Sequence, residues 1–158
     1  MNKRKYTIVQ ILPALNTGGV ERGVVEISKA LIENNFRSIV ISSGGYMVSQ
    51  ITRNGGIHYA LDVQTKNPLK WPKIRNQLKI ILESENVDLI HFCSRVPAWI
   101  GVPLGTVLDI PIITSVHMRF RKANFFKKYY NSILTKGNSI IAISKHIEES
   151  IKFSFPQV

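Results

Sequence analysis

A pair of adjacent glycines, Gly18 and Gly19, lies where a short apolar run gives way to a helical pattern. Residues 6–12 before the pair are mostly apolar and β-branched, as in a buried strand. Residues 20–32 after it repeat apolar side chains at helical spacing. Glycines at such a turn let backbone N–H groups approach an anion at the positive end of the helix. The same pair is also typical of a tight connection that binds nothing.

The spacing of the glycines excludes two familiar phosphate loops. The chain has no Gly-x-x-x-x-Gly-Lys-Ser/Thr sequence, and glycines at 18, 19 and 23 do not fit Gly-x-Gly-x-x-Gly. The next apolar run ends in Ser42-Ser43-Gly44-Gly45, with no acidic residue placed to hold a ribose. We therefore do not expect a dinucleotide site.

The rest of the chain alternates strand-like and helix-like segments. No two strand-like runs are joined by a two-residue hairpin turn, so each successive pair needs a crossover connection. This pattern predicts one α/β domain over residues 1–158, with a parallel sheet of about six strands and helices on both faces. The expected strands are 6–12, 36–42, 57–61, 88–92, 111–116 and 139–143, and the expected helices are 20–32, 47–53, 72–85, 97–108, 125–134 and 145–152.

Ligands of such sheets bind outside the carboxyl ends of the strands, so polar residues at those ends are the candidate site residues. We expect them to converge on one rim: Asn16, Thr17, Gly18, Gly19, Ser43 to Gly45, Thr65, Lys66, Asn67, Ser94, Arg95, His117, Ser144 and Lys145.

Two of these side chains have the chemistry to contact a substrate directly. His117 could exchange a hydrogen bond with a sugar hydroxyl, or it could simply bond a nearby carbonyl. Arg95 could bind a phosphate or carboxylate, or it could tie loops together. His91, inside a strand, is interpreted as structural, and the single cysteine, Cys93, as a buried thiol. Neither a metal-ligand cluster nor a Gly-x-Ser-x-Gly elbow is evident.

The formal net charge of +11 favours an anionic partner. Its densest part, residues 119–130, interleaves aromatic rings with Arg119, Arg121, Lys122, Lys127 and Lys128. This composition suits an anionic membrane surface; it would also suit nucleic acid, or a solvated helix face whose rings turn inward. No window has the ~18 apolar residues of a spanning helix, and no signal-peptide cleavage pattern follows the basic start, so we expect a cytoplasmic protein.

Five groups of residues, in order along the chain, resemble the amino-terminal half of a bacterial family-four glycosyltransferase, closest to the lipopolysaccharide-core type. They are Leu12 to Leu15 with Gly18 to Gly23, Asp62 to Pro68, Ser94 to Trp99, Thr114 to His117 and Ile141 to Ser144. The resemblance implies one Rossmann-like half of a GT-B fold. It further implies transfer of a sugar from a nucleotide-diphosphate donor, with retention of configuration and without a metal or other cofactor.

The resemblance also assigns roles to single positions. It implies that Gly18 and Gly19 face the donor diphosphate and that His117 is the catalytic histidine near the transferred sugar. Asn16, Thr17, Lys66, Asn67, Ser94 and Arg95 would lie on the acceptor side. The basic aromatic stretch 119–130 would meet a lipid-linked glycan acceptor or the inner face of the plasma membrane.

One departure from the family pattern concerns the donor. Family members have a second domain that binds the donor and neutralises the leaving diphosphate, and we expect this carboxyl-terminal domain to be absent from residues 1–158. We therefore expect little transferase activity unless a separate donor domain joins the chain. The alternative is a non-catalytic adaptor that binds an anionic glycan or membrane. Nucleic acid is not an expected partner, because no reading helix or RNA-binding motif is recognisable.

Overall fold

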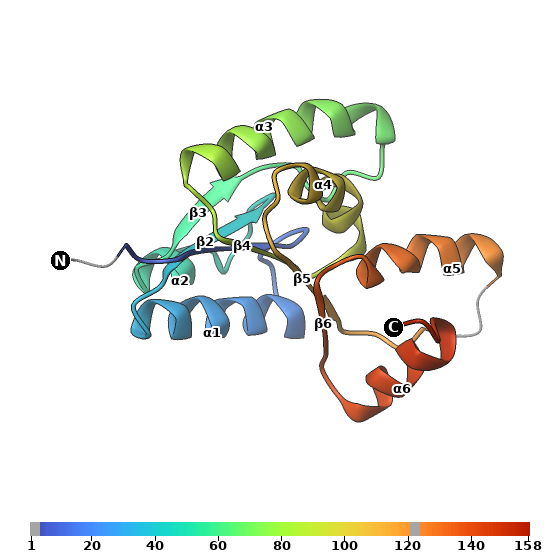
Figure 1. The fold of residues 1–158 in the computed structure, drawn as a ribbon. Helices are drawn as coiled ribbons and strands as arrows, with labels where there is room; N and C mark the ends of the chain where they lie inside the picture. The colour runs from blue at the N-terminus through green and yellow to red at the C-terminus, as the bar shows by residue number, and fades with distance from the viewer. Residues whose placement is uncertain (1–3, 121–123) are drawn as a thin grey trace.

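The computed structural model describes residues 4–120 and 124–158, which form a six-stranded parallel sheet with helices on both faces (Figure 1). The predicted fold class is confirmed. The strand order is β3-β2-β1-β4-β5-β6, so β1 and β4 are the neighbouring central strands. The strands are β1 (Thr7–Ile11), β2 (Arg37–Ser42), β3 (Ile57–Ala60), β4 (Leu89–Phe92), β5 (Ile112–Val116) and β6 (Ser139–Ala142).

The helices follow the predicted order with small shifts at their ends. They are α1 (Gly19–Glu33), α2 (Val48–Arg53), α3 (Trp71–Ser84), α4 (Arg95–Val107), α5 (Phe125–Ser132) and α6 (Lys145–Ser154), with 3-10 turns η1 (Pro68–Lys70) and η2 (Ile133–Thr135). The prediction that Pro97 opens the fourth helix is wrong by two residues. Pro97 is the third residue of α4, where a missing N–H costs nothing because the first four amides have no partner within the helix.

Two apolar cores lie on the two sides of the sheet. The larger core packs Val9 and Ile11 of β1 against α3 and α4, and the smaller one packs Val24 and Val25 of α1 against Leu12. Because successive strand residues point to opposite faces, β1 contributes to both cores. Both cores meet at β1 and β4, which places the carboxyl ends of these two strands on a rigid base.

Gln10 is an exception among the buried residues of β1, because its side-chain amide is polar and fully buried. Its side chain alternates with Val9 and Ile11 and so lies on the face covered by α1 and α2. Within the described residues neither Nε2 nor Oε1 has a hydrogen-bond partner. A buried polar group without a partner loses its hydration and gains nothing in return, which destabilises the fold.

We therefore expect Gln10→Met, which keeps the length of the side chain and removes both polar atoms, to raise the free energy of unfolding by about 1–3 kcal/mol. Urea denaturation monitored by circular dichroism measures this change. Gln50→Met is the matched control, because Gln50 is exposed on α2. A Gln10→Met protein less stable than the parent would mean that the amide makes a bond essential to the fold.

Candidate functional site

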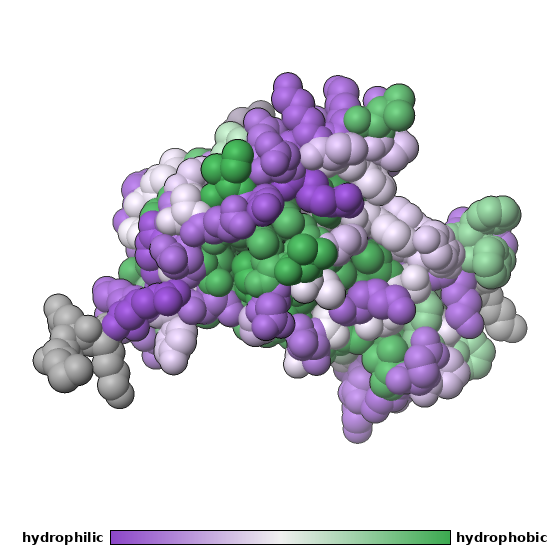
Figure 2. Space-filling view, turned by 45° about the horizontal axis from the view of Figure 1, so that its top comes forward, coloured by the Kyte–Doolittle hydropathy of each residue, from purple (hydrophilic) through white to green (hydrophobic). Residues whose placement is uncertain are grey.

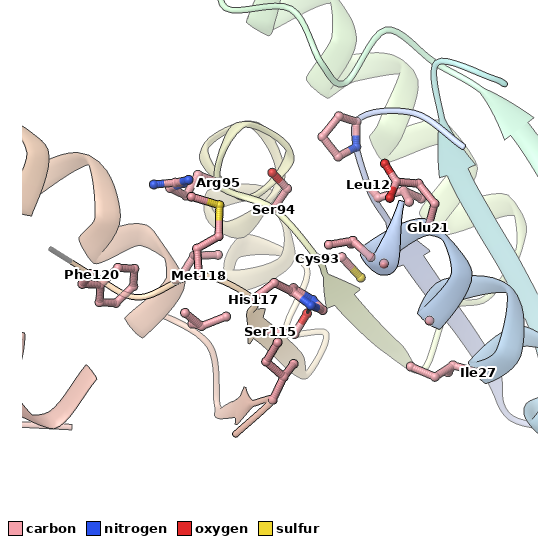
Figure 3. A pocket seen from close by; sticks show the side chains of 17 residues that line it. Leu12, Glu21, Ile27, Cys93, Ser94, Arg95, Ser115, His117, Met118 and Phe120 are labelled. Carbon is pink, nitrogen blue, oxygen red and sulfur yellow. Dashed lines mark hydrogen bonds between the residues drawn. The ribbon is translucent and has the colours of Figure 1, made fainter. Parts of the chain in front are cut away.

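The site lies where the strand order reverses, between β1 and β4. The chain leaves β1 for a helix on one face of the sheet and leaves β4 for a helix on the other face, so the two loops diverge and open a crevice. A pocket of about 630 Å³ occupies it (Figure 3). Its lining comes from the end of β1, the first half of α1, the β4–α4 junction and the ends of β5 and β6, and includes Leu12, Gly19, Glu21, Ile27, Cys93, Ser94, Arg95, Ser115, His117, Met118 and Ile143.

The loop that carries the glycine pair is held by the loop after β2. The Leu15 N–H donates to the Gly44 carbonyl at 2.8 Å, and the Met47 N–H donates to the Leu15 carbonyl at 2.8 Å. Gly45 is required at this contact, because its φ is +140° and an added Cβ would lie 2.4 Å from the Leu15 carbonyl. The predicted strand-to-helix turn is thus fixed from outside as well as by its own sequence.

Gly19 lines the pocket as the first residue of α1, and an added Cβ there would meet nothing within 4 Å. Gly18 precedes it with extended backbone that any residue adopts. What Gly18 accommodates is the Glu21 carboxylate, which curls back so that Oε2 lies 2.3 Å from where a Cβ would stand. An acidic side chain in the first turn interacts favourably with the helix dipole. The positive end of α1 therefore carries a carboxylate of its own.

His117 directly follows β5 and is half-buried in the pocket wall, with its Nε2 2.8 Å from the Ser115 hydroxyl. The two residues are two positions apart and so share one face of the strand. Burial lowers the pKa of His117, and the nearby Glu21 carboxylate offsets part of that change. Figure 3 shows the His117 ring in the pocket wall. With Nε2 bonded to Ser115, Nδ1 is the other ring nitrogen that could bond a ligand.

Near His117, two buried groups lie at the end of β4: His91 within the strand, outside the pocket lining, and Cys93 just after it, in the lining. Burial lowers the pKa of His91 to about 4, and the neighbouring His117 adds to that shift. Burial raises the pKa of Cys93 to about 12, so the thiol is not ionised at neutral pH. The interpretations of His91 as structural and Cys93 as a buried thiol agree with this placement.

Arg95 lies at the first turn of α4 and forms the side of the pocket nearest α5. Its Nη1 donates to the Asn131 side-chain oxygen at 2.8 Å, and its guanidinium stands 5.6 Å from the centre of the Tyr130 ring. No carboxylate within the described residues forms an ion pair with it. Arg95 thus ties α4 to α5 and still keeps a positive charge at the pocket edge.

Comparison with known families and structures identifies the family of this chain. The family model described as Glycosyltransferase Family 4 matches residues 17–156 of the chain. The chain belongs to glycosyltransferase family 4. The predicted family is thereby confirmed, and a search of curated protein sequences finds no significant match.

Solved structures of similar fold include a glycosyltransferase from Rickettsia africae, with 35% identity and a TM-score of 0.81 over 95% of this chain. HepE from Anabaena is 13% identical with a TM-score of 0.75 over 94% of the chain, and MurG from Acinetobacter baumannii is 16% identical with a TM-score of 0.66 over 90%. The family-4 chain spans 40%, 41% and 42% of the lengths of these proteins, in that order. The latter two likenesses concern the fold alone.

Only some of the predicted site residues of this family-4 chain meet at the pocket. Gly19, Ser94, Arg95 and His117 line it, and Gly18 adjoins Gly19. The other predicted site residues lie outside the lining of this pocket. Asn16 and Thr17 are exposed in the loop after β1, while Lys66 and Asn67 are exposed before α3, where Asn67 caps η1 by accepting from the Leu69 N–H at 3.0 Å.

The basic aromatic stretch of the chain lies beside the pocket rather than in it. Arg119 is exposed after β5, and Lys127 and Lys128 are exposed on α5. Arg121 and Lys122 lie outside the described residues. Contact of these basic residues with an anionic membrane or a lipid-linked acceptor remains a prediction.

Two contributors to the family-4 pocket were missed from the sequence. Glu21 is not among the predicted site residues although it lines the pocket, and Ser115 is not predicted as the partner of His117. The spacing of Ser115 and His117 on one strand face was a usable signal. The sequence carries no usable signal for the apolar wall formed by Ile27, Met118 and Ile143, because these residues come from three separate parts of the chain.

Within the described residues, no group of three or more His, Cys, Asp or Glu side chains is arranged to hold a metal ion. The helices that the structure describes include none that is both long enough and apolar enough to cross a membrane.

The burial of His91 predicts an acid-sensitive fold. Its pKa is about 4 in the folded state against an ordinary value of 6.5, so between these pH values the unfolded chain binds a proton that the folded chain refuses. Stability should therefore fall as the pH drops from 6.5 to 4, by about 3 kcal/mol from this residue. The free energy of unfolding, measured against pH, should vary less steeply over this window in His91→Gln. His146→Gln, an exposed control, should keep the parental slope.

The contact at Gly45 predicts unequal effects of two glycine substitutions in the same region. Gly45→Ala places a Cβ against backbone atoms at positive φ and should destabilise the fold by about 2 kcal/mol or more. Gly19→Ala meets empty space and should leave the melting temperature unchanged or slightly higher. Thermal unfolding compares the two, and equal losses would mean that the Gly45 contact does not hold the loop.

Proposed function

We propose that the chain is the acceptor-side half of a retaining glycosyltransferase that moves a sugar from a nucleotide-diphosphate donor to a lipid-linked envelope glycan of the lipopolysaccharide type. The observation that carries the proposal is a pocket at the β1–β4 reversal, with Gly19 and His117 in its wall, in a member of family 4. Anabaena HepE in complex with UDP and glucose supports a nucleotide-sugar donor.

On the donor side, the free amides at the start of α1 would bind the diphosphate next to Gly18 and Gly19. Glu21 stands at that end, so the diphosphate has to displace its carboxylate or bind beside it. In the transfer, the bond between the anomeric carbon and the diphosphate oxygen breaks, the carbon bonds to the acceptor hydroxyl oxygen, and the proton of that hydroxyl passes to the leaving diphosphate. The negative charge that develops on the diphosphate then requires cationic side chains or amides nearby. We propose that these groups replace a metal.

His117 is the proposed catalytic histidine near the transferred sugar. Because Nε2 is held by Ser115, a substrate hydroxyl would bond to Nδ1. Arg95 and Ser94 would shape the acceptor end of the pocket, with Asn16, Thr17, Lys66 and Asn67 as more distant acceptor contacts. The sugar transfer would take place at the inner face of the plasma membrane, next to anionic lipid.

A chimera tests the proposal directly. Residues 1–158 replace the matching part of the Rickettsia africae glycosyltransferase, and transfer is assayed with a panel of nucleotide sugars for the chain alone and for the chimera. We expect transfer only from the chimera. His117→Ala and Gly19→Ala should each lower the rate by about tenfold to a thousandfold, since each disturbs a group close to the reacting bond.

His146→Ala is the matched control, because this exposed histidine lies on α6 away from the pocket lining. Robust transfer by residues 1–158 alone would contradict the need for a donor domain. A chimera that binds an anionic glycan but transfers nothing, beside an active parent, would favour the non-catalytic adaptor.

A further inference from the structure

A row of four polar side chains lies at the carboxyl ends of two neighbouring strands. His91 lies in β4 with Cys93 just after it, and Ser115 lies in β5 with His117 just after it. The register places Ser115 level with Cys93, on the side of the sheet that α1 covers. Figure 2 shows hydrophilic residues over much of one outer face, where water completes their hydrogen bonds. The buried members of the row must find their partners inside the protein.

The hydroxyl of Ser115 has two polar neighbours in this row. Its Oγ lies 2.8 Å from Nε2 of His117, and a hydrogen bond from it offsets part of the effect of burial on the pKa of the Cys93 thiol. Ser115 is only 3% exposed, so bulk water does not replace either neighbour. Either atom of the pair between Ser115 and His117 could be the donor. The direction of this bond decides which ring nitrogen of His117 carries the proton.

The direction follows from what each choice leaves without a partner. If the Nε2–H of His117 donated to Ser115, the Ser115 O–H would have only the Cys93 sulfur as an acceptor among the described residues. A thiol sulfur accepts weakly, and a buried O–H without a good acceptor loses its hydration and gains little in return. If the Ser115 O–H donates to Nε2 instead, its single proton has a strong acceptor. The second direction is therefore favoured.

The Cys93 thiol has an acceptor of its own and does not compete for this bond. Burial raises its pKa to about 12, so the sulfur keeps its proton and can donate it. Its Sγ lies 3.7 Å from Nε2 of His91, whose pKa burial lowers to about 4 so that the ring is neutral near pH 7. Each imidazole thus accepts through Nε2 from the polar residue two positions away. Ser115 is left to His117 alone.

We propose that Ser115 is a positioning residue that holds His117 as the tautomer with its proton on Nδ1. The nitrogen left for a ligand is then a hydrogen-bond donor, which suits an oxygen of a sugar hydroxyl or of a phosphate group. A protonated Nδ1 accepts no proton from an attacking hydroxyl, so His117 acts by donating a hydrogen bond and not as a base. For the identity of the ligand this assignment rests on the proposed function, in which the acceptor proton passes to the leaving diphosphate.

Nuclear magnetic resonance of the 158-residue chain measures the tautomer directly. The chain is labelled with nitrogen-15 histidine, and the ring nitrogens are recorded at about pH 8, where His117 is neutral because burial lowers its pKa. His117→Gln assigns its signals by their loss. We expect the chemical shift of a protonated nitrogen for Nδ1 of His117 and that of an unprotonated nitrogen for Nε2. The reverse pattern in the parent chain would overturn the proposal without any substitution at Ser115.

Substitutions at Ser115 then test the cause. Ser115→Ala removes the donor and should return His117 toward the Nε2–H tautomer that free histidine prefers, whereas Ser115→Thr keeps a hydroxyl and should keep the Nδ1–H signal. Ser38→Ala is the matched control, because Ser38 is buried in β2 with its Oγ 2.8 Å from that of Ser28. It loses a similar bond away from His117 and should leave the His117 signals unchanged. A parental pattern in Ser115→Ala, or the same change in Ser38→Ala, would contradict the positioning role.

The chimera with the Rickettsia africae enzyme adds a readout of transfer. Ser115→Ala should lower its kcat by about tenfold or more, Ser115→Thr should recover most of that loss, and Ser38→Ala should keep the parental rate. The resonance measurement contains neither donor nor acceptor, so an inactive chimera would count against the proposed transfer and not against the tautomer. An active chimera whose His117 carries its proton on Nε2 would leave the transfer standing and overturn the role of Ser115.

Discussion

The reversal of strand order between β1 and β4 is the constraint on which the rest of the structure depends. Parallel strands must be joined by crossovers, and a sheet that grows in both directions from its centre sends its first and fourth helices to opposite faces. The loops after β1 and β4 then cannot cover the strand ends between them. The pocket is the space that this connectivity leaves open, and both apolar cores hold its floor rigid.

Opposite charges lie at the two sides of that pocket. The positive end of α1 is matched by the Glu21 carboxylate, while Arg95 keeps a positive charge without a carboxylate partner among the described residues. Between them His117 is held neutral by burial and oriented by Ser115. A ligand with a diphosphate at one end and hydroxyl groups at the other would therefore meet different chemistry on the two sides of the pocket.

The sequence predicts the fold well, because each strand is a short apolar run and each helix has an apolar face. The start of α4 shifted to Arg95 because the first four amides of a helix need no partner, so Pro97 does not mark a unique first residue. The site was harder to predict. Asn67 follows a strand end but caps η1 instead of facing the crevice, and the contact of Glu21 with Gly18 depends on a side-chain conformation that residue order does not determine.

The apolar wall of the pocket is exposed to water, and catalysis in the pocket requires that water be excluded from it. Met118 is 64% exposed, Ile143 is 54% exposed and Ile27 is 42% exposed, and all three line the pocket. Stabilising charge in a transition state is most effective where water is excluded, because screening by water weakens each electrostatic interaction. An open wall of this kind excludes water only when another surface covers it. If the chain takes part in the transfer that we propose, the exposure of Met118 and Ile143 and the charge that develops in the transition state together require a surface that covers these two side chains.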